Sequence, residues 1–174
     1  SITESGCLMT RDLKPVPNGG RVCILGGGPG GSACAIALKR EAAALGKNIE
    51  VVILEQKKFE EDRQYNQCIG VLSPPLEDIL KEQLGVALPK ELVVKKIDGY
   101  CLHTAHCNLP LIGDEKGDTY AVKRSKFDAF MLREAERAGA TVLHNRATEI
   151  EFSDDGVLIY TEGENCPATV VVGA

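Results

Sequence analysis

The sequence predicts an α/β fold: a Rossmann-like βαβ parallel sheet with flanking helices and a small antiparallel β addition. Three features support this prediction: an apolar run at residues 22–25, an alanine-rich helical stretch after a glycine-rich turn, and a second apolar run at 51–54 that ends in Glu55. The first run is too short and too apolar for a surface helix and is typical of a buried parallel strand. Strand, turn, helix and strand in this order indicate a dinucleotide-binding βαβ unit.

The glycine-rich turn matches the pattern G-x-G-x-x-G at Gly26, Gly28 and Gly31. Gly26 permits a tight turn, Gly28 has no Cβ and lets a pyrophosphate approach the backbone, and Gly31 lets the helix pack close to the sheet. Pro29 suits the first helical turn because its missing N–H has no intrahelical partner there. The strand before the motif and the helix after it favour nucleotide binding over a glycine-rich turn of an ordinary α/β protein.

Polar groups around this turn complete the predicted nucleotide site. The free amides of Gly30, Gly31 and Ser32 are expected to point at the phosphates, together with the positive end of the helix dipole. Glu55 follows the second strand, where a carboxylate accepts hydrogen bonds from both hydroxyls of an adenosine ribose and repels a 2′-phosphate. Gly46 is the expected end of the helix.

The composition is that of a globular protein without a nucleic-acid signature. The 174 residues are 44% hydrophobic and carry a net charge of −5, with no basic run. No apolar segment approaches the roughly 20 residues of a membrane span, and the first residues lack the pattern of a signal peptide. Seven cysteines, an odd number, suit a reducing cytoplasm better than a disulfide scaffold.

Two regions are expected: a leader at residues 1–19 and a domain at 20–174 with an inserted β segment at about 92–122. The leader has no hydrophobic periodicity and is expected to pack loosely or to be disordered. A helix is expected to begin with Ser73 as its N-cap and to end at Gly85. Short β-like runs in the inserted segment predict two to four strands in a small antiparallel sheet.

The last third of the chain alternates between helix and strand signals. Ser125 is expected to cap a helix, with Asp128 at the third position of a capping box. The run ATVLHN at 140–145 predicts another strand of the parallel sheet. Three further β runs follow, and the first two are expected to form a hairpin at Asp155 and Gly156.

The segment at 124–128 reads R-x-x-F-D. Together with GGGPGG upstream and TVVVGA at 169–174, it resembles the FAD-dependent geranylgeranyl reductase family, in the flavoprotein group that includes the single-component aromatic hydroxylases. The resemblance covers roughly residues 20–174. In that family the last strand continues into Asp-Gly and a substrate domain. The resemblance therefore implies an amino-terminal portion of a longer enzyme, with weak or absent FAD retention and no turnover alone.

The resemblance also implies roles for particular residues. Arg124 would reach the pyrophosphate of FAD, and a planar, permanently charged guanidinium suits phosphate oxygens. The alternative for Arg124 is a solvated arginine beside Lys123 and Lys126. The ADP part of FAD would be held by four residues of the βαβ unit: Gly26, Gly28, Gly31 and Glu55.

Cys68, in the run YNQCIG, is the one candidate catalytic residue. Geranylgeranyl reductases tend to carry a cysteine followed by glycine near this point, facing the flavin and the substrate cavity, and Cys68-Ile69-Gly70 matches loosely. A thiol can act as a proton donor, or as a nucleophile if its pKa is lowered. It can also serve merely as a small apolar filler.

No metal site is expected in the run CLHTAHC. Cys101, His103, His106 and Cys107 are ligand types, but they fall within seven residues. Structural zinc sites usually take pairs of ligands separated by a long loop, and alternate side chains of an extended chain point to opposite faces. An edge strand of a substrate-facing sheet is predicted instead.

The resemblance implies an FAD-dependent oxidoreductase that reduces carbon–carbon double bonds of a prenyl chain on a lipid or pigment. NAD(P)H is one candidate electron donor, the cytoplasm is the expected location, and a lipid substrate implies peripheral membrane contact. No nucleic-acid partner is expected. Two alternatives stay open: a flavin monooxygenase that hydroxylates an aromatic substrate, and a nucleotide-binding module without chemistry.

Overall fold

The structure is a computed structural model that describes residues 15–59, 68–112 and 117–174. Most of the leader predicted at 1–19 lies outside these residues. In chain order the elements are β1 (Arg21–Leu25), α1 (Pro29–Ala44), β2 (Glu50–Leu54), β3 (Val71–Leu72), α2 (Leu76–Glu82), the 3-10 helix η1 (Lys90–Leu92), β4 (Val93–Ile97), β5 (Gly99–His103), β6 (Asn108–Ile112), β7 (Thr119–Val122), α3 (Arg124–Arg137), β8 (Thr141–Leu143), β9 (Ala147–Ser153), β10 (Gly156–Thr161), β11 (Cys166–Ala168) and β12 (Val170–Gly173).

A four-stranded parallel sheet forms the centre of the fold, in the order β12-β1-β2-β8. β1 pairs in parallel with β2 on one side and with β12 on the other, so Cys23 lies opposite both Val52 and Val171. The strand predicted at residues 22–25 therefore lies inside a parallel sheet, and the predicted α/β fold is confirmed. The strand predicted in ATVLHN is β8, parallel to β2.

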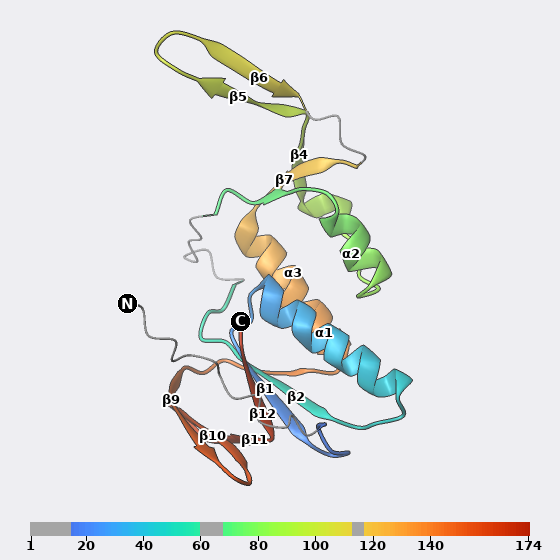
Figure 1. Ribbon diagram of the computed structural model, residues 1–174, viewed down its shortest axis with the longest axis vertical. Coiled ribbons are helices and arrows are strands. Elements are labelled where there is room, and N and C mark those ends of the chain that lie inside the picture. Colours follow the sequence, from blue (N-terminus) through green and yellow to red (C-terminus); the bar gives the residue numbers. More distant parts are fainter. Residues whose placement is uncertain (1–14, 60–67, 113–116) are drawn as a thin grey trace, which may run out of the picture.

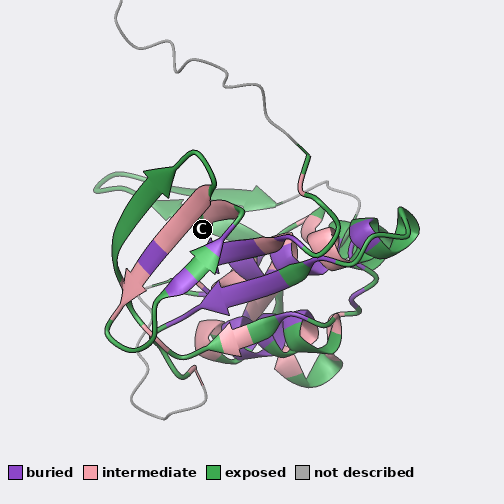
Figure 2. Ribbon diagram, turned by 90° about the horizontal axis from the view of Figure 1, so that it is seen from below, coloured by how far each residue is buried: buried purple, intermediate pink, exposed green. Residues whose placement is uncertain are grey.

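The parallel sheet is the middle one of three layers. Helices α1 and α3 lie side by side on one face, and the antiparallel sheet β11-β10-β9 covers the other (Figure 1). Side chains alternate along β1, so Val22 and Ile24 join the core beneath the helices, whereas Cys23 joins a second core between the sheets. This inter-sheet core contains six buried residues: Cys23, Val52, Leu54, Ile159, Cys166 and Ala168. Buried residues run along the parallel strands in Figure 2.

Glycines end both long helices in the left-handed conformation. Gly46 has a φ of 64° and Gly139 a φ of 96°. After α1, the amides of Gly46 and Lys47 donate to the carbonyls of Ala43 and Ala42, which is the Schellman pattern. The stop predicted at Gly46 is confirmed.

Both predicted serine caps are wrong. Ser73 does not cap α2: its carbonyl accepts from the Leu76 amide at 3.1 Å, which forms a turn, and α2 begins at Leu76. Ser125 lies inside the first turn of α3, whose N-cap is Lys123 without a side-chain cap hydrogen bond. Asp128, the expected partner in that capping box, contacts Arg124 instead.

The inserted segment contains four strands, as expected, but they divide between two antiparallel sheets rather than forming one. β4 and β7 pair with each other, and β3 joins β7. β5 and β6 form a separate hairpin that projects from the body of the molecule (Figure 1). The run CLHTAHC is not one extended strand either: β5 ends at His103, and His106 and Cys107 lie in the turn before β6.

The end of the chain contributes to two layers. β9 and β10 form the predicted hairpin, with a turn at Asp154 and Asp155. The single run predicted after it divides into β11, which pairs with β10, and β12, which pairs with β1. Within the described part of the chain, no helix is both long and apolar enough to cross a membrane.

Candidate functional site

The turn between β1 and α1 is closed tightly by its glycines. Gly26 has a φ of 111°, and a Cβ on it would overlap the Ala174 carbonyl. A Cβ on Gly31 would overlap the Gly26 carbonyl oxygen, and one on Gly27 would lie 2.9 Å from Cβ of Glu55. The close approach of helix to turn that was predicted for Gly31 is therefore present, and Pro29 is the first residue of α1 as predicted.

The outer side of this turn is open. A Cβ built on Gly28 or Gly30 would meet no atom within 4 Å. Within the described residues, the amides of Gly28, Gly30 and Gly31 have no hydrogen-bond partner. They lie at the N-terminal end of the 16-residue helix α1, where the helix dipole is positive. An open backbone face with free N–H groups at a helix N-terminus is suited to a phosphate group.

Ser32 does not offer its amide to this face, contrary to the expectation from the sequence. Its N–H donates to the Gly28 carbonyl at 2.9 Å, as part of the first helical turn. Its hydroxyl donates to the Gly27 carbonyl at 3.0 Å, and the side chain is fully buried. Ser32 therefore holds the turn in shape rather than presenting a donor to a ligand.

Glu55 faces the turn from the end of β2. One carboxylate oxygen accepts from the Gly27 amide and the other from the Lys57 amide, both at 2.7 Å. The residue is 9% exposed. A carboxylate oxygen accepts two hydrogen bonds, so each oxygen retains one acceptor site. Two ribose hydroxyls match these two remaining sites.

A pocket of about 470 Å³ is lined by residues that follow β2 and β8 and by one side of α3. His144 directly follows β8, and its Nδ1 lies 3.3 Å from the Glu55 carbonyl oxygen. Leu132 of α3 reaches the glycine turn, since a Cβ built on Gly27 would lie 3.0 Å from Leu132 Cδ1. The pocket is lined by Lys58, Phe59, Ala129, Leu132, Arg133, Glu136 and His144. Its mixed apolar and polar lining and its place at the carboxyl ends of β2 and β8 are suited to the base and ribose of a nucleotide.

Sequence reasoning did not identify these pocket residues. His144 could have been found, because it directly follows a predicted parallel strand, and ligands bind at the carboxyl ends of such strands. Leu132 and Ala129 carried no signal beyond helical periodicity.

A second cluster lies at the start of α3. Arg124 Nε donates to Asp128 Oδ1 at 2.6 Å, one helical turn away, and Asp128 is buried. The Arg124 side chain is 29% exposed, so it is not the solvated arginine that was the alternative. The buried carboxylate raises the pKa of Arg124 through this hydrogen bond. Asp128 is therefore a residue that positions Arg124.

Cys68 belongs to the same cluster. Its Sγ accepts from the Gly70 amide at 3.4 Å, and it also hydrogen-bonds to the Arg124 side chain. These two interactions, the Gly70 amide first, hold the pKa of Cys68 below its ordinary value. The thiol is exposed among the described residues, whereas an apolar filler would be buried. A lowered pKa favours the thiolate, and thus a nucleophile, over a proton donor.

A further pocket lies elsewhere. It has a volume of about 700 Å³ at the base of the β5–β6 hairpin, and the Lys96–Asp118 ion pair is part of its lining. It shares no residue with the glycine turn or with the Cys68 cluster.

In the described residues no group of three or more His, Cys, Asp or Glu side chains is placed to hold a metal ion, and Cys101 and His103 lie on a fully exposed strand.

Comparison with known sequences gives modest matches, and no family model matches the chain. The chain is 27% identical over 142 residues to a probable electron transfer flavoprotein-ubiquinone oxidoreductase of Schizosaccharomyces pombe. It is 31% identical over 144 residues to a flavin-dependent halogenase of Aspergillus carbonarius, and 30% over 146 residues to digeranylgeranylglycerophospholipid reductase 1 of Methanothermobacter thermautotrophicus. These matches cover 79%, 80% and 81% of this chain but 22%, 27% and 34% of the relatives. The chain thus spans between a fifth and about a third of their length.

Solved structures share the fold. A geranylgeranyl bacteriochlorophyll reductase-like protein of Thermoplasma acidophilum matches with a TM-score of 0.65 at 23% identity, over 90% of this chain and 39% of that one. A variant of the halogenase PltM in complex with FAD matches with a TM-score of 0.65 at 17% identity, over 90% of this chain and 34% of that one. The expected likeness to geranylgeranyl reductases and to other flavin-dependent enzymes is confirmed.

Proposed function

We propose that this chain is the FAD-binding portion of a flavin-dependent oxidoreductase, with the ADP half of FAD held at the glycine turn and Glu55. The observation that carries the proposal is the open face at Gly28 and Gly30, where free amides meet the positive end of α1 beside a buried carboxylate. The flavin enzymes among the sequence relatives and the FAD complex of a protein with this fold support it.

Each group of residues has a distinct task in this proposal. The amides of Gly28, Gly30 and Gly31 bind the pyrophosphate, and Glu55 accepts from the two ribose hydroxyls. The pocket beside Leu132 and His144 encloses the adenine and excludes water from it. Arg124, held by Asp128, adds a fixed positive charge for the phosphates.

FAD, when bound, supplies the redox chemistry. Cys68 is the residue we propose for the reaction itself. Its thiolate is stabilised by the Gly70 amide and by Arg124, and it is exposed to a ligand. As a thiolate it can attack an electrophilic carbon, or take up a proton at Sγ and release it again.

For the substrate, we propose the carbon–carbon double bonds of a prenyl chain on a lipid or pigment. The reductase of Methanothermobacter thermautotrophicus, whose name specifies a digeranylgeranylglycerophospholipid, supports this choice at 30% identity. NAD(P)H as electron donor, a cytoplasmic location and peripheral contact with a membrane surface belong to the same proposal.

A second candidate is flavin-dependent oxidation of an aromatic substrate by oxygen. The observation that favours it is the 31% identity to a flavin-dependent halogenase, a match as strong as the one to the reductase. The natural protein that carries this chain distinguishes the two activities. Anaerobic saturation of a prenyl substrate supports the first, and oxygen-dependent NAD(P)H consumption stimulated by an aromatic compound supports the second.

Nucleotide binding is tested on the chain itself by calorimetric titration with FAD, ADP and FMN. FAD and ADP should bind weakly and reversibly, and FMN, which lacks the ADP half, should not. Gly28→Leu should abolish FAD and ADP binding without loss of thermal stability, because the φ of −64° at Gly28 suits any residue and its surroundings are open.

Ala44→Leu is the matched control for this variant. It places the same leucine side chain at the exposed, opposite end of α1 and should leave binding unchanged. Unchanged FAD binding by Gly28→Leu would disprove the position of the pyrophosphate. A chain that binds neither FAD nor ADP would contradict the proposed nucleotide site.

A further inference from the structure

Two cysteines that are distant in sequence meet in the inter-sheet core. Cys23 lies in the middle of β1 and Cys166 begins β11; their exposed fractions are 0% and 5%. Both side chains belong to the same buried cluster, and the two thiols are within hydrogen-bonding reach of each other. Both are free thiols in this structure. The candidate cofactor site uses neither of them.

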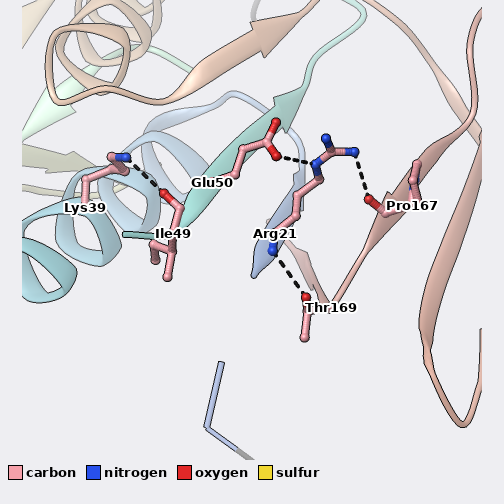
Figure 3. Close-up of polar contacts among 6 residues, drawn as sticks. All are labelled: Arg21, Lys39, Ile49, Glu50, Pro167 and Thr169. Atoms are coloured by element: carbon pink, nitrogen blue, oxygen red, sulfur yellow. Dashed lines mark hydrogen bonds and ion pairs between the residues drawn. The ribbon is translucent and has the colours of Figure 1, made fainter. Parts of the chain in front are cut away.

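A positive charge lies at one side of this thiol pair. Arg21 donates from Nη1 to the Pro167 carbonyl at 3.1 Å and from Nε to Glu50 at 2.7 Å (Figure 3). Its guanidinium also lies near the thiol of Cys166, the residue directly before Pro167. The Arg21 side chain is 35% exposed, so the pair is buried but adjoins a charged group that reaches solvent.

We propose that Cys23 and Cys166 are a reversible dithiol–disulfide pair that joins β1 to β11 when a peroxide is present. In the first step the Cys166 sulfur attacks one oxygen of the peroxide, the O–O bond breaks, and hydrogen peroxide yields a sulfenic acid and water. In the second step the Cys23 sulfur attacks the sulfenic sulfur, the S–O bond breaks, and a second water leaves. The two thiols lose two electrons in total, and one peroxide molecule is reduced.

The surroundings of the two sulfurs explain why Cys166 reacts with the peroxide first and Cys23 second. Burial raises the pKa of the Cys23 thiol to about 12, so Cys23 is a poor first nucleophile. Cys166 lies next to the Arg21 guanidinium and, at 5% exposed against 0% for Cys23, is the more accessible of the two thiols. It is also on β11, which among the described strands pairs with β10 alone and so lies at the edge of its sheet. Cys166 is therefore the thiol that a small oxidant meets first.

The disulfide would act on the strand that closes the glycine turn. β12 follows Cys166 by four residues and pairs with β1, and the Ala174 amide donates to the Leu25 carbonyl at 3.0 Å. A link between residues 23 and 166 closes most of the chain into one loop and restricts the unfolded state. The oxidised protein should therefore be more stable, with β12 held against β1.

The test is oxidation of the chain with hydrogen peroxide, followed by peptide mapping without reduction. We expect a Cys23–Cys166 cross-linked peptide, removed by dithiothreitol, and a melting temperature raised by roughly 5–15 °C. Cys166→Ala should abolish both changes. Cys34→Ala, which removes a half-buried thiol from α1, should leave both intact.

A map of the oxidised wild-type chain that contains only other pairs, or only over-oxidised single cysteines, would overturn the proposal. Because this map needs no variant, a folding defect in Cys166→Ala would not prevent the decision. A Cys23–Cys166 link without any rise in melting temperature would overturn the stabilising role.

Discussion

Replacing Glu55 by glutamine is a stringent test of the nucleotide site, because one carboxylate both shapes the turn and faces the expected ribose. In the structure its two oxygens accept from the amides of Gly27 and Lys57 at 2.7 Å each. Glutamine has almost the same volume but only one acceptor oxygen. Its NH₂ group would face one of the two amides, donor against donor.

The expected loss of stability follows from these two bonds. One charge-assisted hydrogen bond becomes neutral and the other is replaced by a repulsive contact, at a site that is only 9% exposed. Together these changes should lower the free energy of unfolding by about 2–3 kcal/mol. For a chain of this size that corresponds to a fall in melting temperature of roughly 5–10 °C.

Thermal unfolding followed by circular dichroism measures this fall, and calorimetry measures the accompanying loss of ADP affinity, expected to be about 10-fold or more. Glu164→Gln is the matched control, since Glu164 is exposed and should change stability by less than about 0.5 kcal/mol. A Glu55→Gln chain as stable as the wild type would refute the role of this carboxylate in fixing the turn. Normal ADP affinity in that variant would refute the position of the ribose.

Two further predictions concern the start of α3. The lowered pKa of Cys68 means that its thiolate persists to lower pH. Its rate of alkylation by iodoacetamide, plotted against pH, should therefore have a midpoint below the pKa of free cysteine, about 8.5. Peptide mapping would follow Cys68 separately from the other cysteines, and a midpoint at about 8.5 would contradict the prediction. Arg124→Lys keeps a positive charge beside Asp128 but loses the planar fork, so the affinities for FAD and ADP, which both carry the two phosphates, should each fall roughly 10-fold. A loss for FAD with unchanged ADP affinity in calorimetry would show that Arg124 lies against the flavin half instead.

The parts of the fold that the sequence predicted correctly depend on local rules. β1, the glycine turn, α1 and β2 lie within 35 residues, and each boundary has its own residue signal, such as Pro29 or Gly46. The same holds for the position of Glu55, because a residue that follows a parallel strand must lie at the sheet edge where the turn also lies. No long-range information was needed for either.

The predictions that were wrong depended on neighbours. Ser125 has the right chemistry for a cap, but β7 ends at Val122 and α3 begins two residues later, so Ser125 falls inside the helix. Ser32 seemed free to bind phosphate, yet its amide and hydroxyl both bond within the turn. The pocket proposed for adenine gathers residues that follow β2 and β8 together with a face of α3, and no sequence pattern connects these three segments.

Helix α3 connects the two halves of the candidate site. Arg124 and Asp128 lie at its start, and Leu132 contacts the region of the glycine turn. With a rise of 1.5 Å per residue, Arg124 and Leu132 are about 12 Å apart along the helix axis. A ligand that touches both the adenine pocket and the Arg124 guanidinium must therefore be extended, as a dinucleotide is and a free base is not. Helix α3 itself thus sets the distance between the two ends of the site.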